Sequence, residues 1–302
     1  MTTDYHKPAL LNQCMDGLRI NPGGVYVDAT FGGGGHAREL LRLLDERGRL
    51  IAFDQDEEVV QQLPEDERLV FVRSNFRYLT NFLKYHHVEK VDGILADLGV
   101  SFNHFDSPER GFSFRFGEQL LDMRMNRKGR QKAADILERY TEEQLADLFF
   151  HYGELQHARR IASAIVKARR QTDVTTASGL MAVVEPLLKR EEVKKELSKL
   201  FLALRIEVND EMGALRKFLL QCPGVLKPAG RIAVLSYHSL EDRLVKNFFK
   251  SGNFEGKIEQ DFFGNRKTPL RPVNNRVIVP DENEIADNPR ARSAKLRVAE
   301  LI

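Results

Sequence analysis

The sequence predicts an α/β protein with an open, doubly wound, mostly parallel sheet and an inserted all-helical subdomain. Its first hundred residues alternate apolar runs of strand length with leucine-rich segments of helical period, which is the pattern of βαβ units. After about Phe105 the chain changes to long helical segments, and strand-like sequence returns only near Gly224. We therefore expect a discontinuous sheet domain, residues 1–104 and 208–302, around a helical insertion, residues 105–207.

The predicted strands are short apolar runs, several of which end in polar residues. Runs that are apolar almost throughout suit a parallel sheet whose two faces are both covered by helices. Leucines at helical spacing in Arg38–Arg47 predict the helix that follows the first strand. In chain order we expect strands at Val25–Asp28, Leu50–Asp54, Leu69–Val72 and Val91–Asp97, then a turn followed by a strand within Gly224–Ser236, and strands at Asn275–Val279 and Ala294–Leu301.

The insertion begins with a segment rich in glycine and arginine, ERGFSFRFG. Thr141 and Gln144 have the spacing of a capping box, which predicts that a helix begins there. Helical periodicity continues through Leu155–Arg170 and Ala177–Arg190. Basic residues cluster in the insertion and near the C-terminus, and each cluster is either a solvated helix face or part of a nucleic-acid-binding surface.

Composition excludes several classes of protein. The 302 residues carry a net charge of only +2, so the surface as a whole does not attract nucleic acid. No apolar run approaches the roughly 18 residues that span a membrane, and the first residues lack a signal-peptide pattern, so we expect a cytoplasmic protein. Cys14 and Cys222 lack paired spacing, and no metalloprotease, serine-hydrolase or P-loop motif occurs, so we expect no metal site.

Four consecutive glycines, Gly32 to Gly35, connect the first predicted strand to a helix. Glycines permit positive φ angles and close approach of a ligand, and the helix that follows directs N–H groups at an anion. Asp54 lies at the end of the second strand, where a carboxylate can accept ribose hydroxyls, as in dinucleotide enzymes. Asp28 favours S-adenosylmethionine over a nicotinamide dinucleotide, because a carboxylate before the loop attracts a cationic amino acid and repels a pyrophosphate. Alternatively, Asp28 caps a helix and Asp54 is a turn residue.

Several ordered segments resemble one family. The segments HKPALL, VDATFGGGGHARELL, DGILADLGVS, ERGFSFRF, ALRIEVNDE, SYHSLEDRLVK and NPRARSAKLRVAE are similar to the ribosomal RNA small subunit methyltransferase H family (RsmH, formerly MraW). The resemblance implies a class I S-adenosylmethionine-dependent methyltransferase fold, Rossmann-like, with a helical subdomain that recognises RNA. It also implies methylation of the exocyclic N4 amine of a cytidine in the decoding region of 16S rRNA. Monomer and homodimer both remain open, as do naked rRNA and the small subunit as substrate.

The resemblance also assigns site residues. It implies that the cofactor is contacted by Gly34, Gly35, His36, Asp54, Phe76, Asp97 and His104, where His104 replaces the glutamine of many relatives. Phe76 follows the third strand and can stack on an adenine or belong to the core. Candidate substrate contacts are Arg205, Asn209, His238, Ser239, Glu241, Asp242, Arg290 and Arg292.

Methylation of an amine needs an acceptor beside it. Because the cytosine N4 lone pair is delocalised into the ring, an acceptor must stabilise the positive charge that develops during attack. Asp97 lies at the carboxyl end of the fourth strand, the edge at which open α/β sheets bind ligands, and is our candidate catalytic residue. Alternatively, Asp97 only binds the cofactor, and a water or the carboxylates of HSLED accept the proton.

The other candidate residues also have purely structural interpretations, and other reactions compete with methylation at N4. Ser239 can cap a helix whose face Asp242 solvates, and Arg205 with Asn209 can form a structural hydrogen-bond pair on one helical face. Methylation at cytosine C5 would need a cysteine nucleophile, and neither Cys14 nor Cys222 follows a predicted strand. Two alternatives from other classes remain open, a nicotinamide oxidoreductase and a non-catalytic RNA-binding or assembly protein that retains the cofactor.

Overall fold

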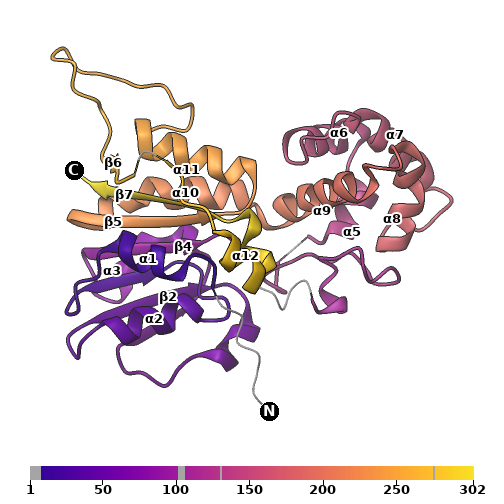
Figure 1. The fold of residues 1–302 in the computed structure, drawn as a ribbon. Coiled ribbons are helices and arrows are strands. Elements are labelled where there is room, and N and C mark those ends of the chain that lie inside the picture. The colour runs from indigo at the N-terminus through magenta and orange to yellow at the C-terminus, as the bar shows by residue number, and fades with distance from the viewer. Residues whose placement is uncertain (1–7, 101–105, 130, 275) are drawn as a thin grey trace. The chain divides into compact units, whose positions relative to one another are not determined.

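The structure is a computed structural model that describes residues 8–100, 106–129, 131–274 and 276–302. The chain divides into two compact units, one of residues 1–99 with 212–302 and one of residues 100–211. The predicted insertion, residues 105–207, lies inside the second unit. Both units appear in Figure 1.

A seven-stranded sheet forms the centre of the first unit. Its strand order is β3-β2-β1-β4-β5-β7-β6, in which the first five strands are parallel and β7 is antiparallel to both its neighbours. Successive strands are added on one side of β1 up to β3 and on its other side from β4 onward, so the strand order reverses between β1 and β4, which is the switch point where open α/β sheets bind ligands. This confirms the predicted class I methyltransferase fold. The strands are β1 Val25–Asp28, β2 Arg49–Asp54, β3 Leu69–Arg73, β4 Val91–Asp97, β5 Leu226–Ser236, β6 Leu270–Pro272 and β7 Lys295–Leu301.

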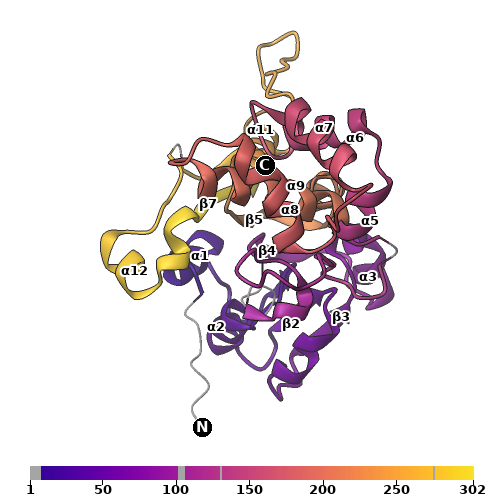
Figure 2. The same cartoon turned by 90° about the vertical axis from the view of Figure 1, so that its right-hand side faces the viewer.

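Helices cover both faces of this sheet. On one face, α1 (Leu11–Leu18) and α2 (Gly35–Leu43) bury leucines against β4, β5 and β7 in a continuous core. Two helices that run before and after β5, α10 (Glu211–Val225) and α11 (Ser239–Ser251), lie on the opposite face (Figure 1, Figure 2). The central strands are therefore apolar on both sides, as their continuous apolar sequences predict. The remaining elements of this unit are η1 Glu57–Gln62, η2 Phe76–Tyr78, α3 Leu79–Tyr85, α12 Glu282–Asp287 and η5 Pro289–Ser293.

Two of the sequence predictions for this unit are wrong. The edge strand is Leu270–Pro272 and not the predicted Asn275–Val279; Asn275 lies outside the described residues, and among residues 276–279 only Ile278 forms an isolated bridge, to Leu296. A proline is tolerated at Pro272 because an edge strand has one side without hydrogen bonds. Gly224 was expected in a turn, yet α10 continues through it to Val225.

In the part of the second unit that the structure describes, every regular element is a helix, and Leu120 and Thr176 form an isolated β-bridge. The helices of this unit enclose one apolar core that includes Phe149, Ile161, Leu180 and Leu204. Thr141 caps the second of them through a capping box with Gln144, as predicted. The predicted helix Ala177–Arg190 is shorter, because Pro186 turns the chain at Glu185–Leu187. The described elements are η3 Pro108–Arg110, α5 Ala133–Arg139, α6 Glu142–His151, α7 Ala158–Ala168, α8 Ala177–Val184, η4 Glu185–Leu187 and α9 Val193–Asn209.

Candidate active site

Three carboxylates lie at the carboxyl ends of neighbouring strands. Asp28 ends β1, Asp54 ends β2 and Asp97 ends β4, and the sheet order makes β2 and β4 the two neighbours of β1. The carboxylates are close enough that Asp97 and Asp54 both act electrostatically on Asp28. The switch point of the sheet is therefore strongly acidic, which favours a cationic ligand.

Asp28 is the most deeply buried of the three. Its side chain is 1% exposed, and Oδ1 accepts a hydrogen bond from Thr30 N at 3.0 Å. Its second oxygen, Oδ2, is buried and has no hydrogen-bond partner among the described residues. Burial, reinforced by Asp97 and Asp54 and opposed by the Thr30 N–H, raises the pKa of Asp28 to about 7. The N-cap of α2 is Gly34, so Asp28 does not cap that helix.

Asp54 organises the glycine loop. Its Oδ2 accepts from Gly32 N at 2.8 Å and its Oδ1 accepts from Asp56 N at 2.9 Å. The second of these bonds is the turn interaction that the sequence also allowed. Asp54 lies at the carboxyl end of β2, where a carboxylate can accept the hydroxyls of a ribose. Asp54 thus joins the end of β2 to the loop that follows β1.

Gly34 needs to be glycine because its φ is +72° and a Cβ there would lie 2.6 Å from the Phe31 ring. It is the N-cap of α2 and supplies no side-chain cap. The first N–H groups of α2 are therefore presented by Gly35 and His36 without a capping side chain. This end of α2 suits the carboxylate of an amino-acid ligand.

His36 itself points inward. Its Nε2 donates to Ala9 O at 3.1 Å, because a carbonyl can only accept, and its Nδ1 lies 3.8 Å from Asp97 Oδ2. Burial lowers the pKa of His36, so the ring is neutral at pH 7. A cofactor contact by this residue would therefore come from its backbone N–H.

Asp97 is held from three sides. Its N–H donates to Thr30 Oγ1 at 2.6 Å, and its Oδ1 accepts from Gly99 N at 3.0 Å. The hydroxyl of Tyr237, which directly follows β5, donates to the same carboxylate. A Cβ on Gly99 would lie 2.8 Å from the Tyr237 ring, so the glycine lets the tyrosine approach. Tyr237 and Thr30 were not among the predicted site residues, although Tyr237 directly follows β5 and Thr30 lies two residues after the end of β1.

Tyr237 remains protonated. Burial, followed by the charge and hydrogen bond of Asp97, raises the pKa of its hydroxyl well above the ordinary value. Its N–H donates to Glu241 Oε2 at 2.9 Å. Tyr237 is therefore a positioning residue, which orients the Asp97 carboxylate.

We expect Tyr237→Phe to lower kcat about tenfold while the KM for S-adenosylmethionine changes less than about twofold, because one hydrogen bond to a charged group is lost. Steady-state kinetics at two cofactor concentrations separates the effect on kcat from the effect on the KM for S-adenosylmethionine. Tyr26→Phe is the matched control, since the Tyr26 hydroxyl is also buried but accepts from Asn21 N at the amino end of β1. Equal losses of kcat in both variants would contradict a positioning role.

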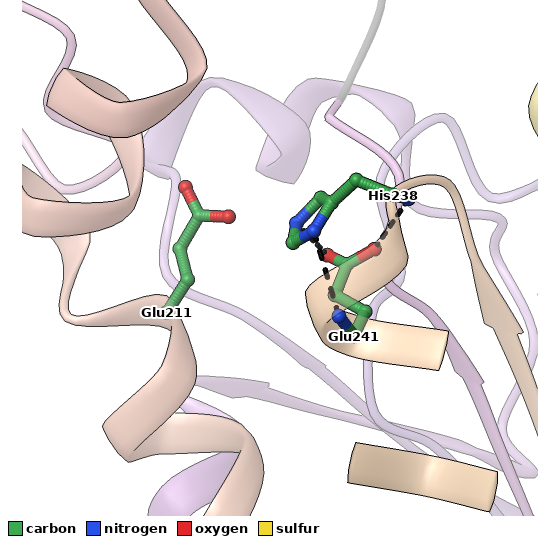
Figure 3. A group of neighbouring side chains, drawn as sticks. All are labelled: Glu211, His238 and Glu241. Carbon is green, nitrogen blue, oxygen red and sulfur yellow. Dashed lines mark hydrogen bonds and ion pairs between the residues drawn. The ribbon is translucent and has the colours of Figure 1, made fainter. Parts of the chain in front are cut away.

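The SYHSLEDR segment forms the start of α11. His238 and not Ser239 is the N-cap residue, so the expected cap at Ser239 is wrong. The His238 ring and the Glu241 carboxylate face each other, with Nε2 and Oε1 3.0 Å apart (Figure 3); Glu211, also drawn there, belongs to the helical unit. Glu241 is 2% exposed. Asp242 forms ion pairs with Arg297 and Lys295 of β7, so it also ties α11 to the sheet.

The remaining candidates are more dispersed. Phe76 begins η2 and meets Phe218 edge-to-face at 5.2 Å between ring centroids. Arg205 forms a bidentate ion pair with Glu211, and Asn209 bonds the backbone of Met123, Met125 and Arg205, which are structural roles inside the helical unit. Arg290 and Arg292 are exposed on η5. His104 lies outside the described residues.

Comparison with known proteins decides the family. A sequence model of the MraW methylase family matches residues 3–302. The chain belongs to the MraW methylase family. It is 59% identical over 296 residues to the ribosomal RNA small subunit methyltransferase H of Bacteroides thetaiotaomicron, covering 98% of this chain and 97% of that protein. The protein of the same name from Flavobacterium johnsoniae is 50% identical over 301 residues, covering 100% and 99% of the two chains.

The acidic switch point fits the cofactor of this methylase. S-adenosylmethionine carries an ammonium and a sulfonium, and Asp28 presents a buried oxygen without a partner beside two further carboxylates. The first turn of α2 suits the methionine carboxylate, and Asp54 suits the ribose. The methylase uses S-adenosylmethionine.

Proposed function

We propose that this methylase transfers a methyl group from S-adenosylmethionine to the exocyclic N4 amine of a cytidine in the decoding region of 16S rRNA, in the cytoplasm. Relatives at 50 to 59% identity bear the name ribosomal RNA small subunit methyltransferase H, which supports an rRNA substrate. The observation that carries the reaction is the Asp97 carboxylate, held by Gly99 N and Tyr237 at the acidic switch point. An acceptor in this position suits an amine that becomes positively charged.

The cofactor, when bound, supplies an activated methyl group on sulfur. The N4 lone pair forms the new N–C bond as the S–C bond breaks and its electron pair returns to sulfur, and N4 then loses one proton. Asp97 stabilises the charge on N4 and accepts that proton. Tyr237, Gly99 and Thr30 keep the carboxylate and its backbone in place, which supplies the positioning that in-line transfer needs.

Methylation at carbon C5 is disfavoured by the state of the thiols. That reaction needs a cysteine thiolate. Burial is the main cause that raises the pKa of both Cys14 and Cys222 well above the ordinary value, so both remain thiols. Cys222 lies inside α10 and donates to Phe218 O at 3.2 Å, as a structural cysteine does.

Mass spectrometry of 16S rRNA nucleosides tests the proposal. We expect N4-methylated cytidine to be missing from cells without the protein, to return with the wild-type chain and to remain missing with Asp97→Asn. An unchanged nucleoside profile in the deleted strain would refute the function.

We also propose that Arg290 and Arg292 contact RNA phosphates. Both side chains are exposed, and η5 leads directly into Lys295, which pairs with Ser236 at the carboxyl end of β5. They therefore lie at the same edge of the sheet as the three carboxylates.

Replacing Arg290 and Arg292 with glutamine is expected to weaken rRNA binding and to reduce the slope of log affinity against log salt by about 1.4 to 1.8, because two phosphate contacts are lost. Filter binding at several salt concentrations measures this slope. Arg42 and Arg47, both exposed near α2, provide a matched double control of equal charge. If both double variants behave alike, the assignment to η5 is wrong.

A further inference from the structure

A long finger connects α11 to β6, and its tip carries two exposed phenylalanines. We define the finger as residues 257–267, and it projects away from the sheet in both views (Figure 1, Figure 2). Phe262 is 98% exposed and Phe263 is 84% exposed. The rings meet edge-to-face at 5.7 Å between centroids and contribute almost nothing to the core. Such a pair indicates a binding surface, since water otherwise covers both rings.

The tip is a closed turn. Asp261 Oδ1 accepts from Phe263 N at 2.8 Å and from Asn265 N at 2.9 Å, and Asp261 N donates to Asn265 O at 2.9 Å. Gly264 permits the turn with a φ of +84°. Below the turn, Gln260 and Arg266 form an antiparallel bridge, and Lys267 N donates to Glu259 O. The two rings are therefore presented by an ordered backbone, which lowers the entropy cost of binding.

Cations flank the aromatic tip. Lys257, Arg266 and Lys267 are all exposed, and none forms an ion pair within the part of the chain that the structure describes. Exposed aromatic rings beside unpaired cations match single-stranded nucleic acid, in which bases stack and phosphates carry the charge. An apolar protein partner would have no need for the three cations.

The finger is remote from the acidic switch point. It leads into Leu270, which pairs with Leu301 at the end of β7, whereas Lys295 at the start of β7 pairs with Ser236 at the carboxyl end of β5. Because β7 has seven residues, its start beside the carboxyl end of β5 and its end beside the base of the finger lie about 20 Å apart. A ligand on the finger therefore does not reach the methyl-transfer site unless it is a large molecule.

We propose that this finger binds unpaired nucleotides of the rRNA substrate outside the methyl-transfer site. Phe262 and Phe263 stack on exposed bases, and Lys257, Arg266 and Lys267 contact the adjoining phosphates. The inference rests on the proposed rRNA substrate and adds a second anchoring point to it. Base stacking tolerates many sequences, so the finger selects unpaired RNA rather than a particular base.

The first test compares long and short substrates. In Phe262→Ala/Phe263→Ala we expect the KM for a long 16S rRNA fragment to rise at least about tenfold, with kcat and the affinity for S-adenosylmethionine unchanged. The KM for a short RNA that carries only the target region is expected to stay the same. Tyr85→Ala, an exposed aromatic on α3, is the matched control and should leave both KM values unchanged.

The second test concerns the cations. Replacing Lys257, Arg266 and Lys267 with glutamine should reduce the salt slope of binding to long rRNA by about 2, while the phenylalanine variant keeps the wild-type slope. An unchanged KM for long rRNA in the phenylalanine variant would overturn the proposal. So would a loss that occurs with assembled small subunits but not with protein-free rRNA, since a ribosomal protein would then be the partner. A wild-type chain that methylates no rRNA would instead refute the proposed function.

Discussion

Replacing Asp97 with asparagine is expected to lower kcat for methyl transfer by at least about a hundredfold. The amide keeps the size of the side chain but loses the charge that stabilises the amine and the base that accepts its proton, and general-base contributions are about 10² to 10⁴ in rate. Single-turnover methyl transfer to rRNA at saturating cofactor measures this loss directly. Calorimetry should show that S-adenosylmethionine still binds, although more weakly, because one of three carboxylates has gone.

Two further variants separate the roles of the carboxylates. Asp92→Asn changes a carboxylate at the amino end of the same strand, where it bonds Val25 N and Lys227, and should leave kcat unchanged. Asp54→Asn should mainly raise the Kd for S-adenosylmethionine, because it weakens the Gly32 bond and the proposed ribose contacts. If Asp97→Asn retained the wild-type kcat, a water or the carboxylates of α11 would be the proton acceptor.

The largest pH effect is expected from Asp28. Its pKa of about 7 means that the ionised fraction rises from about a tenth at pH 6 to about nine tenths at pH 8. Only the ionised form attracts the cations of S-adenosylmethionine, so we expect the Kd to fall by up to about tenfold over this range. Calorimetry in buffers of different ionisation enthalpy should also detect proton release on binding near pH 7. Asp28→Asn should bind the cofactor weakly and lose most of this pH dependence.

The same carboxyl group opposes folding when no cofactor is bound. Because its folded pKa lies above the ordinary value of 3.8, the folded chain holds a proton that the unfolded chain releases, and stability falls as pH rises from about 4 to above 7. At 1.36 kcal/mol per pKa unit, the difference between 3.8 and about 7 corresponds to roughly 4 kcal/mol. Asp28→Asn should therefore be more stable than the wild type at pH 8 in the cofactor-free state.

Urea unfolding at pH 5.5 and pH 8 tests this expectation, with the solvent-accessible Asp45→Asn as the control. The gain in stability of the Asp28 variant over the wild type should be about twice as large at pH 8 as at pH 5.5, because only about half of the cost is present at the lower pH. If Asp28→Asn gained no stability at pH 8, the buried Asp28 carboxylate would not lower the free energy of unfolding of the wild type. If Asp28→Asn gained stability but kept the wild-type affinity for S-adenosylmethionine, Asp28 would not be a cofactor-binding residue.

Local sequence was sufficient for most of the sheet. Continuous apolar runs predict Val25–Asp28 and Val91–Asp97 with the bounds that the structure has, because strands covered on both faces leave a strong signal. The prediction of the edge strand failed, since the predicted segment Asn275–Val279 and the observed strand Leu270–Pro272 are both short. Which of the two segments becomes the edge strand depends on which one pairs with β7, and the local sequence does not determine that pairing.

The site shows the same division. The acidic strand ends and the glycine loop were visible in the sequence, because binding a cationic ligand needs particular residue types at the ends of particular strands. The sequence did not show that Asp54 bonds Gly32, that Tyr237 holds Asp97, or that Arg205 and Asn209 are engaged within the helical unit. These contacts join residues through packing and hydrogen-bond geometry.

The sequence by itself therefore determined the class of fold, the family and the chemical character of the cofactor site, because strand patterning and ligand-binding residue types are local properties. Only the tertiary structure decided the protonation of Asp28 and the partners of Asp97. It also showed the finger between α11 and β6 with its exposed phenylalanines. Burial, the meeting of distant charges and the exposure of a side chain all depend on how the whole chain packs.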